Sequence, residues 1–217
     1  MIKVERPRSL PRWTPGWFRS SNRQDIQLLV RSGMPKPILK SDVRILRPTE
    51  YERLRQGART LENQTRSDAL LLTGLRYVEA QRLQSNHDWV DGRFIHLPAL
   101  AQRKTKRTQK ERWVRLSSKD ATLLPFLFKT KPLPTWKGWT QNLERWATNA
   151  GLDSVGLGPK TLRKTWESWL VSSYPERVLE VFLSQGHTQM TALSHYLGLP
   201  FTQADKDAML EYVDGWA

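Results

Sequence analysis

The stretch Gly186-His187-Thr188-Gln189-Met190-Thr191-Ala192-Leu193-Ser194-His195-Tyr196 places a histidine nine residues before a tyrosine. Upstream, Lys160-Thr161-Leu162-Arg163 supplies two cations, and Thr73-Gly74-Leu75-Arg76-Tyr77-Val78-Glu79 supplies another arginine. A tyrosine hydroxyl has a pKa of about 10, so it needs nearby cations before it can attack a phosphodiester. Arginine suits the phosphate because its planar guanidinium binds two oxygens at once and stays charged. The pattern predicts a phosphoryl-transfer site in which Tyr196 is the nucleophile.

These segments, in this order, resemble those of the tyrosine recombinases, the family of phage, archaeal and plasmid integrases and the Xer proteins. In that family the first arginine lies in a TGLRxxE-like segment, which residues 73–79 match here. The second segment usually reads His-x-x-Arg, and here Lys160 stands in the histidine position ahead of Arg163. The third usually reads Leu-Gly-His, and here Gln185-Gly186-His187 is followed by Tyr196. The resemblance covers roughly residues 46 to 200 and rests on all the segments together.

The resemblance implies a site-specific DNA recombinase or integrase of a mobile element, such as a virus or a plasmid. Tyr196 would cleave and rejoin DNA through a 3′-phosphotyrosyl intermediate, while Arg76 and Arg163 hold the nonbridging oxygens. His187 would hydrogen-bond the same phosphate, and Lys160 would add charge or assist deprotonation of the tyrosine. The resemblance also implies that double-stranded DNA is the partner, that four protomers assemble on two DNA sites, and that no cofactor is needed.

Residues 92–97 and 112–116 alternate polar and apolar side chains, which predicts two strands. The connector between them is polar and cationic, and in the resembling family a hairpin here carries the lysine that protonates the leaving 5′ oxygen. If the turn is centred on Thr108, Lys106 opposes Lys110 and is the best match, with Lys104 as the alternative. We expect further DNA contacts from Arg103, Lys104, Arg107, Lys110 and Lys164.

Each motif alone also has an ordinary structural interpretation. Arg76 and Glu79 could form a simple i,i+3 helix ion pair, although the resemblance suggests that Glu79 supports Arg76 or Lys160. The cationic connector could be a solvated loop, and Tyr196 could belong to the core. Two other functions remain open: DNA relaxation of the type IB topoisomerase kind, and DNA binding by a non-catalytic relative.

The composition indicates a nucleic-acid-binding protein. The chain carries 35 Lys and Arg against 21 Asp and Glu, a net charge of +14. It has no cysteine, which excludes disulfides, cysteine zinc sites and thiol nucleophiles. The four histidines form no ligand-spaced pair, so we expect no metal. No apolar run approaches the ~18 residues that span a bilayer, so the expected location is cytoplasmic and DNA-associated.

We expect two parts: a basic N-terminal arm over residues 1–47, with eleven Lys and Arg against three acidic residues, and a catalytic domain over residues 48–217. The predicted fold class is α+β, mainly α, with a small antiparallel sheet or hairpin. Thr49 and Glu52 form a candidate capping box for the first helix, and an apolar helix follows Ser67. Tryptophans between residues 136 and 146 recur on one helical face as expected core. Other helices are expected near residues 119–128, from Pro159, from Pro175, and over 191–197 and 205–212.

Overall fold

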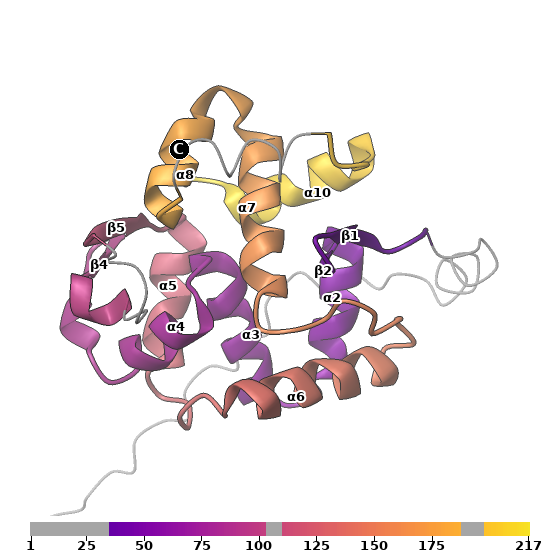
Figure 1. Cartoon of the computed structure of the whole chain (residues 1–217), viewed down its shortest axis with the longest axis horizontal. Helices are drawn as coiled ribbons and strands as arrows, with labels where there is room; N and C mark the ends of the chain where they lie inside the picture. The colour runs from indigo at the N-terminus through magenta and orange to yellow at the C-terminus, as the bar shows by residue number, and fades with distance from the viewer. Residues whose placement is uncertain (1–34, 103–109, 188–197) are drawn as a thin grey trace, which may run out of the picture. The chain divides into compact units, whose positions relative to one another are not determined.

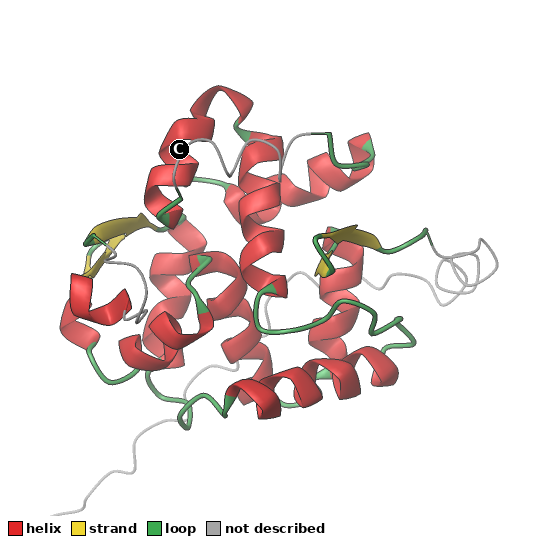
Figure 2. Ribbon diagram, in the orientation of Figure 1, coloured by secondary structure: helices red, strands yellow, loops and turns green. Residues whose placement is uncertain are grey.

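The structure is a computed structural model that describes residues 35–102, 110–187 and 198–217. Its elements lie within residues 37–217, which form one compact unit. Helices predominate, and the described strands form two small antiparallel sheets (Figure 2). The coarse prediction of a mainly helical α+β fold is therefore confirmed.

The first sheet pairs β1 (Ile38–Lys40) with β2 (Val43–Ile45), and the second has the order β3 (Val90–Asp91), β4 (Phe94–Leu97) and β5 (Arg112–Arg115). The helices are α2 (Pro48–Gly57), α3 (Leu61–Thr73), α4 (Tyr77–Leu83), α5 (Ser118–Leu127), α6 (Trp136–Asn149), α7 (Thr161–Ser173), α8 (Val178–Gln185) and α10 (Gln203–Val213). Short 3-10 turns cover His87–Trp89, Ala99–Gln102 and Pro175–Arg177. Both strands predicted around the connector are present, and Leu97 pairs with Arg112 at its base.

Helix α7 is the central element of the core. It packs against α3, α8, α10 and β2 (Figure 1). Four side chains that recur along its inward face are buried: Leu162, Trp166, Trp169 and Leu170. The indole N–H of Trp169 donates to the carbonyl of Leu46 at 2.9 Å, which ties the helix to the chain after β2. A helix surrounded on several sides holds its first turn in a fixed place, and that turn carries Arg163.

Helix α6 confirms most of the predicted tryptophan stripe. Trp139, Leu143 and Trp146 are buried, and Trp139 and Trp146 meet edge to face with ring centroids 5.3 Å apart. Trp136 is the exception, because it lies in the first turn and is 49% exposed. The prediction that Trp136 belongs to the core was therefore wrong.

Three helix starts differ from their predictions. Helix α2 is capped at Arg47 and not at Thr49, with Pro48 in the first turn, where its missing N–H costs nothing. Glu50, not Glu52, closes that cap by accepting the Arg47 N–H at 2.9 Å. Helix α3 begins six residues before Ser67, at Leu61. Helix α7 begins at Thr161, so Pro159 lies just outside it.

The predicted N-terminal arm extends too far along the chain. Residues 38–45 form the β1–β2 hairpin, whose turn residues Ser41 and Asp42 both have positive φ, as a two-residue type I′ turn requires. Arg44 and Arg47, counted as arm cations, are buried in ion pairs with Glu50 at 2.6 Å and Asp205 at 2.7 Å. The compact unit therefore begins near residue 37 and not 48. The rest of the predicted arm, residues 1–34, lies outside the described residues.

Candidate active site

Arg76 is held by the cap of a short helix. Helix α3 ends at Gly74, whose φ of +59° turns the chain, and Arg76 becomes the N-cap of α4. Glu79, at the third position of α4, accepts the Arg76 backbone N–H at 2.8 Å. The other oxygen of Glu79 accepts the Arg76 guanidinium at 2.7 Å. Backbone and side chain of Arg76 are thus fixed by one carboxylate, as the i,i+3 spacing predicted.

Arg163 comes from the first turn of α7 and is almost completely buried. One nitrogen of its guanidinium donates to the carbonyl of Gly74 at 2.7 Å and to the side chain of Gln185 at 3.0 Å. The other donates to the main-chain carbonyl of Gln185 at 2.5 Å. Arg163 therefore joins α7 both to the turn before Arg76 and to the end of α8.

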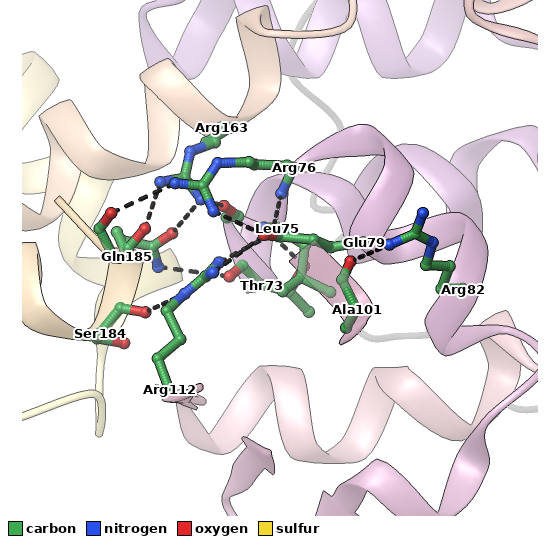
Figure 3. A network of polar contacts seen from close by, with 12 residues as sticks. Thr73, Leu75, Arg76, Glu79, Arg82, Ala101, Arg112, Arg163, Ser184 and Gln185 are labelled. Carbon is green, nitrogen blue, oxygen red and sulfur yellow. Dashed lines mark hydrogen bonds and ion pairs between the residues drawn. The ribbon is translucent and has the colours of Figure 1, made fainter. Parts of the chain in front are cut away.

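The two predicted arginines meet at the end of α8. Arg76 donates to the carbonyl of Gly186 at 3.3 Å, and Arg163 donates to the carbonyl of the preceding residue, Gln185. Figure 3 shows the two guanidinium groups next to each other above Gln185. The segments that carry Arg76 and Arg163 are far apart in the sequence, but both side chains bind the end of α8 at consecutive main-chain carbonyls. The next residue is His187.

His187 follows a glycine-terminated helix. Gly186 has a φ of +69°, and the His187 N–H donates back to the carbonyl of Phe182 at 2.9 Å, as helix C-caps of this kind do. Nε2 of His187 lies 2.8 Å from Oε1 of Glu167 and 3.3 Å from the Arg163 guanidinium. The structure therefore brings Arg76, Arg163 and His187 together at the end of α8.

Arg112, the first residue of β5, belongs to the same network and was not predicted from the sequence. Its guanidinium donates to both oxygens of Glu79, at 2.9 and 2.8 Å, and to the carbonyl of Ser184 at 3.1 Å (Figure 3). Strand alternation was the available signal, because Arg112 shares a face with Val114 and Leu116, which are both buried. Arg112 is a buried member of the network, so its charge serves the fold around Glu79.

The cations control the charge of Glu79. Burial alone would raise its pKa, but hydrogen bonds and charge from Arg112, helped by Arg76 and Arg163, lower the pKa to about 2. Burial in turn lowers the pKa of Arg112, and Glu79 counteracts this. Glu79 is therefore an anion at neutral pH, and it supports Arg76, as predicted, together with the unforeseen Arg112.

Glu167 was also missed by the sequence analysis. It lies one helical turn after Arg163 on α7, and the two side chains form an ion pair at 2.8 Å. The i,i+4 spacing to Arg163 was visible in the sequence, but the contact with His187 joins two elements and has no local signal. Gln185, the residue before Gly186, was likewise not singled out.

The other predicted cations lie at the edge of the network or outside the described residues. Lys160 directly precedes α7 and is exposed, and Lys110 is exposed beside β5. Lys164 donates to the carbonyl of Lys40 at 3.0 Å; burial and the charge of Lys160 lower its pKa. Outside the described residues lie the predicted nucleophile, the hairpin lysine with its alternative, and two connector arginines: Tyr196, Lys106, Lys104, Arg103 and Arg107.

No group of three His, Cys, Asp or Glu side chains in the described parts of the chain could hold a metal ion. No helix among those residues is long and apolar enough to cross a membrane. No model of a protein family matches the chain, and no curated protein matches it at a significant level.

Proposed function

We propose that this protein cleaves and rejoins DNA strands as a tyrosine recombinase does, and acts as a site-specific recombinase or integrase. Tyr196 attacks the scissile phosphorus, and Arg76 and Arg163 hold the nonbridging oxygens. His187 hydrogen-bonds the same phosphate, and Lys160 adds positive charge. Lys106 delivers a proton to the departing 5′ oxygen.

The observation that carries the proposal is the meeting of Arg76, Arg163 and His187 at the end of α8. These three residues come from three separate sequence motifs, which lie more than 20 residues apart along the chain. Alternative interpretations of each motif, such as an isolated helix ion pair, give no reason for the three to lie together. A phosphate that accepts from two guanidinium groups and an imidazole does give such a reason.

The exposure of the side chains favours an anion as the ligand. Arg76 and His187 are 26% and 25% exposed, whereas Glu79 and Glu167 are 2% and 1% exposed. The carboxylates are more deeply buried than Arg76 and His187, so an approaching phosphate meets a guanidinium and an imidazole before it meets a carboxylate. The ion pairs described above join three arginines, Arg76, Arg112 and Arg163, to these two carboxylates, which leaves one excess positive charge in the network.

The proposed reaction is a transesterification. The Tyr196 oxygen forms a bond to phosphorus and loses its proton, while the bond from phosphorus to the 5′ oxygen breaks and that oxygen takes a proton. The 3′-phosphotyrosyl bond keeps the energy of the phosphodiester, so a 5′ hydroxyl from another strand can reverse the step. Double-stranded DNA is the proposed partner, with four protomers on two sites.

A nicked suicide substrate tests the chemistry, because loss of a short 5′ fragment traps the covalent adduct. We expect the wild-type chain to form an adduct with double-stranded DNA, and Tyr196→Phe to form none. Tyr174→Phe is the matched control, since the Tyr174 hydroxyl only donates to the carbonyl of Val213 at 2.9 Å. Adduct formation by the Tyr196→Phe variant, or DNA binding by the wild type without any adduct, would refute the proposal.

A second assay separates recombination from relaxation. The wild-type chain is incubated with supercoiled plasmids that carry two target sites or none, and the products are resolved by electrophoresis. Exchange that requires both sites supports a recombinase. Relaxation of the plasmid without sites indicates the topoisomerase activity instead.

A further inference from the structure

Glu167 joins two of the residues to which we assign the phosphate. It lies on α7, its side chain is 1% exposed, and its Oε1 contacts both Arg163 and Nε2 of His187 at 2.8 Å. Burying a carboxylate is costly unless it is paired and hydrogen-bonded. The ion pair with Arg163 already balances the charge of Glu167, so it does not explain why Glu167 also contacts His187.

The chemistry of the partners identifies which atom holds the proton. A carboxylate paired with arginine accepts hydrogen bonds, and a guanidinium only donates them. Nε2 of His187 lies 2.8 Å from Oε1 of Glu167 and 3.3 Å from the Arg163 guanidinium, which can donate to an unprotonated Nε2 but cannot accept from it. The shorter contact decides between these arrangements, because two acceptor atoms 2.8 Å apart would repel each other: Nε2 carries the hydrogen and donates it to Glu167.

We propose that Glu167 is a positioning residue that fixes the ring of His187 with a proton on Nε2 and holds it beside Arg163. This inference rests on the proposed function, in which the ring of His187 keeps Nε2–H on Glu167 and donates to the phosphate from a protonated Nδ1. Glu167 is shielded by the two side chains that it holds, so it acts through them and does not touch the DNA.

The test begins with histidine-labelled protein and ¹⁵N–¹H NMR without DNA. An imidazole N–H that is exposed to water exchanges too quickly to be seen, whereas one donated to a buried carboxylate is protected. We expect a protected Nε2–H signal, assigned to His187 by its absence from His187→Asn. The signal should persist in Glu167→Gln, whose amide oxygen can still accept, and disappear in Glu167→Ala.

Cleavage of the suicide substrate gives the second measurement. We expect Glu167→Ala to lower the cleavage rate about ten- to a hundredfold, as the loss of a hydrogen bond between charged groups does, and Glu167→Gln to recover part of it. Glu180→Gln is the matched control, because Glu180 is an exposed carboxylate that pairs with Arg115 and Arg177 at the surface. Thermal unfolding checks that each variant folds. If the alanine variant does not fold, Glu167→Asp replaces it, because the shorter side chain keeps the charge near Arg163 but withdraws from the imidazole.

Three results would overturn the inference. The first is the lack of a protected His187 signal in the wild type, and the second is its persistence in Glu167→Ala or Glu167→Asp. The third is cleavage by that variant at the wild-type rate. If the wild type itself forms no adduct, the proposed function fails, while the NMR signal still decides whether Glu167 positions His187.

Discussion

Replacing Glu79 by glutamine should expose how strongly the arginine network depends on one carboxylate. Glu79 accepts three guanidinium contacts, one from Arg76 and two from Arg112, at 2.7 to 2.9 Å. The amide in Glu79→Gln has nearly the same shape but no charge, so the buried Arg112 loses its counter-ion. Breaking a buried ion pair by removing one partner costs about 3 to 5 kcal/mol.

The pKa of Glu79 gives a second, separate magnitude. Its fall from 4.5 to about 2 in the folded protein corresponds to about 3 kcal/mol, at about 1.4 kcal/mol per pH unit. Because the pKa is lowered on folding, this stability is fully present above about pH 5 and is lost as the pH falls towards 2. Both routes therefore predict that Glu79→Gln loses about 3 kcal/mol at neutral pH, or about 6 to 12 °C in Tm.

Urea unfolding of both proteins at a series of pH values between 2 and 7 provides the assay. The wild type should lose about 3 kcal/mol of unfolding free energy between pH 5 and pH 2 relative to Glu79→Gln, so the two curves converge in acid. Glu180→Gln, which removes only exposed ion pairs, should change the stability by less than about 1 kcal/mol. Parallel curves for the wild type and Glu79→Gln, or a difference below about 1 kcal/mol at pH 7, would refute the reasoning.

Two further predictions concern the scaffold. Burial raises the pKa of Asp120 to about 7, although the hydrogen bonds from Ser117 oppose this. Asp120 therefore stabilises the fold most below pH 4, and this contribution is lost as the pH rises through 7. Asp120→Asn should abolish this fall of the unfolding free energy with pH in urea unfolding, and an unchanged pH dependence would contradict the assignment. Gly74→Ala, with φ +59° and a new Cβ 2.5 Å from the Trp166 ring, should lose about 1 to 3 kcal/mol more than Gly92→Ala, whose φ is +55° but whose Cβ meets nothing within 4 Å. Equal urea midpoints for the two variants would show that the overlap at Gly74 is relieved at no cost.

Regular periodicity explains which parts of the fold could be predicted from sequence. The inward face of α7 and most of the α6 stripe follow from apolar residues that repeat every three to four positions. The turn at Gly74 follows from glycine, and the Arg76–Glu79 ion pair follows from the i,i+3 spacing of the two residues. These signals are local, so no knowledge of the tertiary fold was needed to find them.

Features that depend on distant partners could not be predicted. The β1–β2 hairpin has strands of only three residues. Arg44 in this hairpin and Arg47 just after it resemble solvated cations until Glu50 and Asp205 are placed beside them. For Arg112, strand alternation indicated the buried face, but its counter-ion Glu79 comes from another element and had no local signal. A charged residue with a distant counter-ion looks the same in the sequence as one on the surface.

The Glu79 carboxylate also links Arg76, a proposed phosphate-binding residue, to the end of the connector whose sequence contains Lys106. Arg112 ends this connector on its C-terminal side, and it binds the same Glu79 that holds Arg76. Arg112 further donates to the carbonyl of Ser184, in the last turn of α8. These contacts join residues from different elements, so together they fix the relative positions of α4, β5 and α8. Under the proposed function, one buried carboxylate thus sets the position of a phosphate-binding arginine and of the strand that follows the proposed general acid.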